Sequence, residues 1–236
     1  NGTNFVGWQI QKNGLSIQEI IQKSLKRLTK QDIIVFGSGR TDAGVHAIEQ
    51  SAHFKTDFKI NDKITFVKSL NFFLLNHNVS VLNIKKKSNN FHSRHSAKKR
   101  FYKYLIISRL SPLTLDKNRA WHIKKKLNVS LIKKGAKILK KIKDFSTFRA
   151  ASCGAKSPIK SLDKVSIRKI GNKIEIIFAS KSFLQQQVRS MVGCLKYLGE
   201  EKWTIKKFKD VASSKKRKKC APPAPAHGLY LQRVKY

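Results

Sequence analysis

Acidic residues are scarce in this chain, and their scarcity argues against several kinds of chemistry. The 236 residues include only 13 Asp and Glu, against 51 Lys and Arg. Hydrolysis by paired carboxylates needs two acids close together, and two-metal phosphodiester chemistry needs several. No cluster of acidic residues in the sequence provides them. A nuclease or a glycosidase is therefore disfavoured.

Cysteine is also scarce, and long apolar runs are absent. The cysteines, Cys153, Cys194 and Cys220, are odd in number and form no C-x-x-C, so neither a disulfide framework nor a zinc site is indicated. No apolar run approaches the ~20 residues that cross a bilayer. Walker, Rossmann and zinc-deaminase motifs are absent as well. We expect a soluble, cytoplasmic protein with no cofactor and no metal.

We expect no secretory signal within the chain as given, because no basic segment leads into an apolar one. The chain starts at Asn1 without Met and reads as the end of a turn that enters a short element. We expect residues before Asn1 in the natural protein.

Positive charge is abundant, with a formal net charge of +38. Such a field attracts polyanions, and each neutralised phosphate of a nucleic acid releases condensed counterions. An anionic membrane surface is the alternative partner. Membrane-binding proteins usually gather their basic residues on one amphipathic helix or tail, whereas Lys recurs along this whole chain. Nucleic acid is the favoured partner, and no membrane is expected.

Hydrophobic periodicity predicts strands and helices in both halves of the chain. Ser16 and Glu19 form a capping box at the start of an apolar stripe that runs to Leu28. The other helices are expected at 63–73, around 131–142, at 185–198 and at 204–212. Strands are expected at 33–38, 50–55, 79–84, 100–107, 165–170, 173–179 and 229–234.

Short links between these elements indicate an α+β fold with a mainly antiparallel sheet. Gly171 and Asn172 suit a tight hairpin, because both tolerate positive φ. We divide the chain into two parts at 1–95 and 96–236. The basic run 215–219 and the proline-rich stretch after it are expected to form an exposed loop.

Asp42 differs from the other seven aspartates, which capping, turns or surface solvation explain. It lies in a loop between two predicted strands, Gly39 to His46, where glycines let the backbone approach a ligand closely. Arg40 and His46 bracket it, and a nearby guanidinium favours the ionised carboxylate that a nucleophile or base needs. Spacing alone still favours a turn aspartate that accepts local backbone hydrogen bonds.

Two further features combine cations with apolar neighbours. The segment from Arg100 to Tyr104 interleaves aromatics with cations, as proteins that stack bases and neutralise phosphates do. As a strand it places Tyr102 and Tyr104 on one face, and without context a half-buried strand is the better interpretation. Arg189 lies in an otherwise apolar helix turn, where an arginine requires a carboxylate partner.

Several motifs together resemble the TruA family of tRNA pseudouridine synthases, in the order of that family and over essentially the whole chain. The segment 39–47, GRTDAGVHA, looks like the family signature. Weaker matches are G-W-Q at 7–9, S-I-Q-E at 16–19, F-H-S-R at 91–94, R-F-Y-K-Y at 100–104, D-F-S-T-F-R at 144–149, V-R-S-M-V-G at 188–193 and G-L-Y-L at 228–231. The proline-rich stretch 221–226 and the region of Asn71 depart from the family pattern.

The resemblance implies a pseudouridine synthase fold, with two similar halves around an extended antiparallel sheet, a basic cleft between them, and a homodimer. The implied substrate is uridine in the tRNA anticodon stem-loop, at positions thirty-eight to forty. Asp42 falls on the catalytic aspartate and Tyr102 on the tyrosine that stacks against the target base. Arg40 falls on the arginine that turns the nucleotide out, and Arg189 on the one paired with the catalytic carboxylate.

Uridine isomerisation involves no net redox change or hydrolysis, so one carboxylate suffices. A non-catalytic RNA-binding or ribosome-assembly protein would explain the charge and the aromatics equally well. That alternative gives no reason for an aspartate in a Gly-Arg loop, and pseudouridine formation in unmodified tRNA distinguishes the two.

Overall fold

The central strand of the sheet is β4 (Lys99–Ser108), in a computed structural model that describes all residues, 1–236. Its alternating residues Arg100, Tyr102 and Tyr104 are buried on one face, as a period of two predicts. The strand order is β2-β8-β4-β7-β6, and β5 pairs with the far end of β4. The remaining bounds are β2 (His46–Ala47), β5 (Trp121–Ile123), β6 (Lys164–Ile170), β7 (Lys173–Ser180) and β8 (Leu229–Lys235).

The pairing in this sheet is mixed. β4 pairs antiparallel with β7 and with β8, and β6 pairs antiparallel with β7. The short strands β2 and β5 pair parallel with β8 and β4. The hairpin between β6 and β7 turns at Gly171 and Asn172 as predicted, although only Gly171 has a positive φ, 53°. The predicted α+β class with a mainly antiparallel sheet is confirmed.

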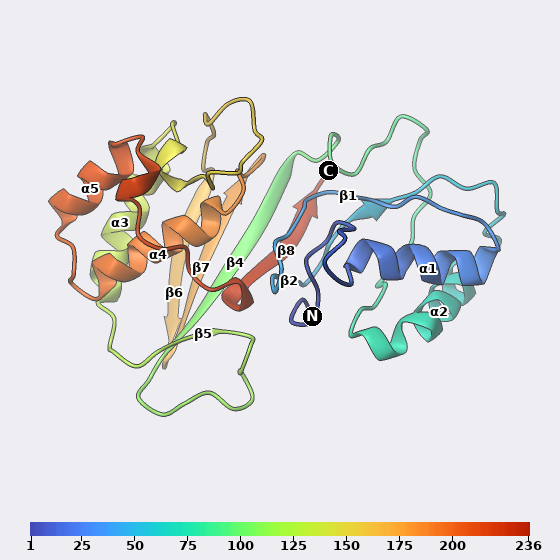
Figure 1. Ribbon diagram of the computed structural model, residues 1–236, viewed down its shortest axis with the longest axis horizontal. Coiled ribbons are helices and arrows are strands. Elements are labelled where there is room, and N and C mark those ends of the chain that lie inside the picture. The colour runs from blue at the N-terminus through green and yellow to red at the C-terminus, as the bar shows by residue number, and fades with distance from the viewer.

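Three helices flank the sheet at one end of the elongated molecule, and two lie at the other end (Figure 1). The first group is α3 (Val129–Lys141), α4 (Gln187–Gly199) and α5 (Ile205–Ser213). The second group is α1 (Ile17–Thr29) and α2 (Lys63–Leu74). The Ser16 hydroxyl accepts the Glu19 amide at 3.2 Å, which confirms that end of the predicted capping box. None of the helices combines the length and the apolar composition that crossing a membrane requires.

The hydrophobic core falls into a large and a small cluster. The large cluster joins the sheet to α3, α4 and α5 and has 29 buried residues, whereas the small one has nine and joins α1 and α2 to Phe5, Trp8 and Val35. The division resembles the predicted parts 1–95 and 96–236, but Val45 belongs to the large cluster and β2 pairs with β8. The segment from Gly39 to Ala47 therefore contacts both parts, and the exact boundary stays a prediction.

Strands in the first part are much shorter than predicted. The segments 33–38 and 50–55 pair only as β1 (Phe36–Gly37) and β3 (Ala52–His53). Next to β1, the Val35 amide donates to the Gln22 side chain, and its carbonyl accepts from Gln18. Because side chains of α1 take these backbone groups, no further strand pairing forms there.

The predicted strand at 79–84 is wrong, because this segment has no strand pairing. Its alternating apolar residues do pack on the small core cluster. The side-chain amide of Asn71 takes both backbone groups of Val81: Nδ2 donates to the carbonyl at 2.9 Å and Oδ1 accepts the amide at 2.7 Å. A side chain on α2 thus replaces the neighbouring strand.

The proline-rich stretch was predicted to be exposed; Pro222 is exposed, but the prediction is wrong for Ala221 and Ala224. Ala221 and Ala224 are buried in the large core cluster. The backbone passes so close to α4 that a Cβ on Gly193 would lie 2.1 Å from the Pro222 carbonyl oxygen. Prolines have no N–H, so this buried segment carries few donors that need a partner. The basic run before it, which includes the 3₁₀ turn Arg217–Lys219, is more exposed.

Candidate active site

The loop from Gly39 to Val45 connects β1 to β2, and Asp42 is near its middle. Backbone bonds tie this loop to the N-terminal segment: Trp8 N donates to Thr41 O at 3.2 Å, and Gly44 N donates to Phe5 O at 3.3 Å. Asp42 forms an isolated antiparallel bridge with Gly7. The loop is therefore held on one side by residues close to the start of the chain.

Gly7 is required for that close approach. Its φ is +112°, and a Cβ there would lie 2.4 Å from the Thr41 carbonyl oxygen. Any side chain at this position would therefore strain the backbone and push the loop away.

The Asp42 side chain is held from the other side by α4. Arg189 Nη1 lies 2.9 Å from Asp42 Oδ2, and Arg189 Nε donates to the Ala224 carbonyl at 2.8 Å. The Arg189 side chain retains 15% of its exposure and the Asp42 side chain 29%. The other carboxylate oxygen, Oδ1, accepts no side-chain hydrogen bond in the chain, so one oxygen is positioned and the other is free. The carboxylate partner that the sequence required for Arg189 is thus Asp42.

Tyr102 lies beside this loop but is largely buried. Its side chain is 8% exposed and packs edge-on against Phe183, with ring centroids 5.2 Å apart. A Cβ on Gly39 would lie 3.5 Å from the Tyr102 hydroxyl, which places this hydroxyl at the start of the loop. Burial raises the pKa of Tyr102 to about 12, against the opposing charge of Arg100 and with a small contribution from Asp42, so the hydroxyl is protonated at neutral pH.

Arg40 stands apart from these three residues. Its side chain is exposed, and it forms neither a hydrogen bond nor an ion pair within the chain. The structure therefore brings Asp42, Arg189 and Tyr102 together and leaves Arg40 on the surface of the same loop.

His46 was predicted to bracket Asp42 but has a structural role. It is buried, its Nδ1 accepts the Gly2 amide at 3.0 Å, and its Nε2 lies 2.9 Å from the Asn118 carbonyl. Its ring stacks on Tyr230 of β8, with centroids 4.8 Å apart. Burial lowers the pKa of His46, which favours the neutral ring that these two contacts need.

Arg100 is a component of the site whose role sequence reasoning missed. Its guanidinium is buried and donates to three carbonyls, those of Ser38, Arg94 and Lys181, at 2.6–3.1 Å. Burial lowers the pKa of Arg100. The side chain cannot neutralise phosphate, as the interleaved pattern suggested, but ties the start of the Asp42 loop to β4. Its alternation with Tyr102 and Tyr104 was the available signal that it points inward.

The neighbouring tyrosine is part of the core. Tyr104 is fully buried, and its hydroxyl donates to the Pro225 carbonyl at 2.7 Å. Lys103 faces away from it, toward Glu175 at 3.5 Å. The half-buried-strand interpretation of the segment is therefore correct for these residues. Nowhere in the chain do three His, Cys, Asp or Glu side chains converge to form a candidate metal site.

The sequence of the chain is similar to known proteins of one class. A family model described as tRNA pseudouridine synthase matches residues 142–236. The chain is 60% identical over 235 residues to tRNA pseudouridine synthase A of Pelagibacter ubique, and this match covers 100% of the chain and 96% of that protein.

Two further relatives carry the same name. The proteins of Parvibaculum lavamentivorans and Ehrlichia canis are 40% and 42% identical, over 100% of this chain and 96% of each relative. At these identities and coverages, the chain belongs to the tRNA pseudouridine synthase A family. The resemblance in the sequence motifs is thereby confirmed, and the chain is a member of an isomerase family.

Proposed function

We propose that this chain isomerises uridine to pseudouridine in the anticodon stem-loop of tRNA, at positions thirty-eight to forty, with Asp42 as the catalytic carboxylate. The observation that carries the proposal is the ion pair between Asp42 and Arg189, which joins residues 147 positions apart. Such a pair orients one carboxylate oxygen and leaves the other free to react. A purely structural loop aspartate would not need this arrangement.

The reaction balances without any co-reactant. The N1–C1′ bond of the uridine breaks, C5 bonds to C1′, C5 loses a proton and N1 gains one. The carboxylate has three conceivable roles: attack on C1′, addition to the uracil ring, or removal of the 2′ proton. Each of them needs the free oxygen of Asp42 next to the nucleoside, with the guanidinium of Arg189 holding the carboxylate in place.

The other residues serve to present the base. A uridine in a stem must leave the stack before its glycosidic bond can be reached. Tyr102 is the aromatic group for the displaced base, through the part of its ring that is not covered. Arg40, exposed on the same loop and without a partner, is placed to contact the phosphate or the vacated position.

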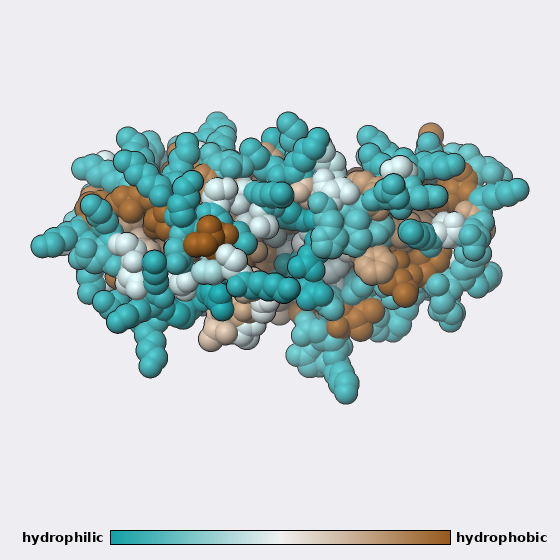
Figure 2. Space-filling model, turned by 90° about the horizontal axis from the view of Figure 1, so that it is seen from above, coloured by the Kyte–Doolittle hydropathy of each residue, from teal (hydrophilic) through white to brown (hydrophobic).

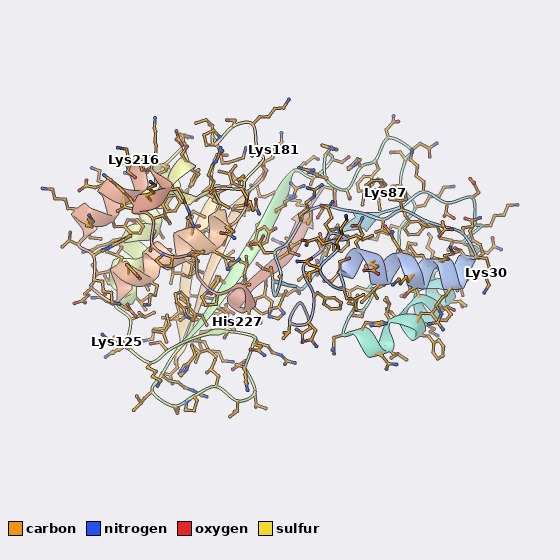
Figure 3. The ribbon with its side chains drawn as sticks, viewed as in Figure 1. Lys30, Lys87, Lys125, Lys181, Lys216 and His227 are labelled. Carbon is orange, nitrogen blue, oxygen red and sulfur yellow. The ribbon has the colours of Figure 1, made fainter.

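The surface charge supports an RNA substrate. Only nine of the 51 Lys and Arg side chains form ion pairs within the chain. Hydrophilic side chains cover most of the face in Figure 2, and the labelled lysines in Figure 3 lie in different segments of the chain, spread along the length of the molecule. We expect two similar halves with a basic cleft between them, and a homodimer, as the family resemblance implies. Sedimentation of the protein with and without tRNA tests the dimer.

Substitution of Asp42 by Asn tests the chemistry. We expect D42N to abolish pseudouridine formation in unmodified tRNA, mapped by carbodiimide-dependent stops, while tRNA affinity stays within a few-fold because phosphate contacts dominate it. Asp57→Asn, at an exposed acid, is the matched control and should behave like the wild type. Substantial turnover by D42N would remove Asp42 as the catalytic group.

A non-catalytic RNA-binding protein remains the second candidate, because charge and exposed aromatics favour it as well. It predicts tRNA binding without pseudouridine at any position. The same mapping experiment on the wild type distinguishes the two, and it also identifies which uridines are converted.

A further inference from the structure

One group of aromatic side chains next to the active-site loop has no part in the mechanism above. Phe36 on β1 and His53 on β3 are cross-strand partners, and their rings stack with centroids 5.2 Å apart at 24°. His92 lies 4.6 Å from His53 and 5.9 Å from Phe36. We call these three rings the aromatic platform. The opposite face of β1 is taken up by Val35 in the small core cluster, so the platform lies on the outer face.

The platform is partly exposed, because Phe36 is exposed and His53 and His92 are half-buried. Phe36 retains 45% of its exposure, whereas the preceding residue, Val35, points to the opposite face and is buried. Single exposed apolar side chains are normal on a protein surface, but a stacked aromatic group is a candidate binding surface.

Hydrogen bonds hold the platform in one arrangement. Ser93 is fully buried, and its Oγ donates to the Phe36 carbonyl at 2.7 Å. The Ser93 amide donates to His53 Nδ1 at 3.2 Å. The strand ribbon and the segment that carries His92 are therefore locked together before any ligand arrives, which lowers the entropic cost of binding.

The platform is linked directly to the Asp42 loop. Arg100 donates both to the carbonyl of Ser38, two residues after Phe36, and to the carbonyl of Arg94, two residues after His92. Gly39, the residue after Ser38, lies against the Tyr102 hydroxyl. Phe36 and Asp42 are six positions apart in the chain, so they are separated by at most ~20 Å, the length of a few nucleotides.

The charge around the platform suits the backbone of a nucleic acid. Lys55 and Arg94 are exposed, lie close enough to influence the platform histidines, and have no ion-pair partner. Burial first, and then the neighbouring positive groups, lowers the pKa of His53 and of His92. Both rings are therefore neutral at pH 7.5, so they offer aromatic faces while the Lys and Arg offer charge.

We propose that the aromatic platform of Phe36, His53 and His92 is a second base-binding subsite, which stacks an unpaired nucleobase of the RNA strand that carries the target uridine. Lys55 and Arg94 bind the adjoining phosphates. This subsite rests on the proposed function, because it assumes that the strand enters the Asp42 loop. It holds the strand beside the target, so that the target uridine can leave the helix without the whole stem-loop sliding.

Phe36→Ala is the primary test, because this exposed side chain contributes little to the core. We expect RNA affinity to fall about tenfold, within the range that loss of one base–aromatic stack produces. Phe36→Tyr keeps an aromatic face and should bind like the wild type. Phe72→Ala is the matched control, since Phe72 is a phenylalanine on α2 that is 68% exposed and lies outside the site. Thermal unfolding of each variant shows whether the fold is intact.

Salt dependence separates stacking from phosphate binding. For Phe36→Ala, the slope of log Kd against log salt concentration should equal that of the wild type. In Lys55→Ala and in Arg94→Ala, the magnitude of this slope should be smaller than that of the wild type by about one. An anticodon stem-loop with 2-aminopurine at successive positions beside the target gives the direct readout, because stacking on Phe36 quenches its fluorescence at one position.

The outcomes distinguish this inference from the proposed function. If the wild type forms pseudouridine while Phe36→Ala binds within twofold and leaves 2-aminopurine fluorescence unchanged at every position, the subsite is wrong and the proposed function stands. If the wild type forms no pseudouridine but Phe36→Ala loses affinity and quenching, the subsite stands and the proposed function is wrong. A wild type that binds no RNA overturns both.

Discussion

Replacing Tyr102 by Ala is expected to lower the free energy of unfolding by about 3–5 kcal/mol, and this magnitude follows from burial. An aromatic side chain covers roughly 150–250 Å², and at ~25 cal/mol per Å² its burial contributes about 4–6 kcal/mol. Tyr102 is 8% exposed, so nearly all of this applies, and Ala keeps only its Cβ. For a chain of this length the midpoint of thermal unfolding should fall by about 6–20 °C.

Tyr102→Phe should behave differently. It keeps the ring in the core and removes a hydroxyl that has no hydrogen-bond partner within the chain. Stability should change by less than about 1 kcal/mol. If the ring stacks on the displaced uracil, tRNA affinity should stay within about twofold, because stacking needs only the aromatic face. A loss of single-turnover rate in this variant would then report a role of the hydroxyl in proton transfer.

The pH dependence of stability, compared between the wild type and Tyr102→Phe, tests the burial of the Tyr102 hydroxyl. The folded-state pKa of Tyr102 is about 12, above its ordinary value of 10. Stability from the buried neutral hydroxyl is therefore complete below pH 10 and is lost as pH rises toward 12. At pH 11 the wild type should have lost about 1.4 kcal/mol more than Tyr102→Phe, relative to pH 8. All other titrating groups are shared, so this difference isolates one residue.

Urea unfolding at pH 8 and pH 11, run beside single-turnover assays at pH 8, measures these quantities together. Equal losses of stability for the wild type and Tyr102→Phe would refute the burial of the hydroxyl. If Tyr102→Ala has an unchanged unfolding midpoint but a severe loss of turnover, the core role is refuted. Stacking on the base would then be the only role left for Tyr102.

Three further predictions concern the surroundings of Asp42. Arg189→Lys should lower the single-turnover rate at least tenfold at nearly unchanged tRNA affinity, because one ammonium cannot contact both Asp42 and the Ala224 carbonyl as the guanidinium does; a wild-type rate would show that the pair is dispensable. Gly7→Ala should destabilise the protein by about 1–3 kcal/mol and slow turnover, since its Cβ meets the Thr41 carbonyl in a strained backbone; an unchanged melting curve would contradict this. Pseudouridine formation should survive exhaustive chelation by EDTA with tRNA folding verified, and loss that one divalent ion restores would refute the cofactor-free reaction.

Helices were predicted well because their hydrogen bonds are local. The expected helix at 63–73 differs from α2 by one residue, and Asp62 caps it with a hydrogen bond to the Ile64 amide at 2.8 Å. The long strands β4, β6, β7 and β8 were also predicted to within one or two residues. Their alternation is maintained over seven or more residues because they pair with each other along their whole length.

The failed strand predictions share one physical cause, which is competition from side chains for backbone groups. A short apolar alternation such as 79–84 signals burial of one face, but it does not reveal which partner takes the hydrogen bonds. Here Asn71 takes them at Val81, and Gln18 and Gln22 take them at Val35. Only the tertiary fold identifies such partners. The lengths of the strands in residues 1–95 therefore could not be predicted from the local sequence pattern.

The candidate site was only partly within reach of the sequence. Asp42 stood out by its glycine-flanked loop, and Arg189 by its apolar surroundings, but no local rule joins residues 147 positions apart. The family motifs supplied that link, and the geometry of the ion pair agrees with it. Phe36 and His53 were overlooked because they lie in different segments and have no distinctive spacing, and His92 was noted only as part of the F-H-S-R segment at 91–94.

The proline-rich segment shows why a departure from the family pattern need not disturb the site. Residues 221–226 run between α4 and β8, and the carbonyls of Ala224 and Pro225 accept from Arg189 and Tyr104. This close-packed segment has to supply carbonyl oxygens that accept hydrogen bonds. Prolines have such a carbonyl but no N–H, so they add no backbone donor that needs a partner. The Ala224 amide bonds back to the Arg189 carbonyl at 3.0 Å. Ala224 thus bonds to both the backbone and the side chain of Arg189, and these two contacts hold the guanidinium where it pairs with Asp42.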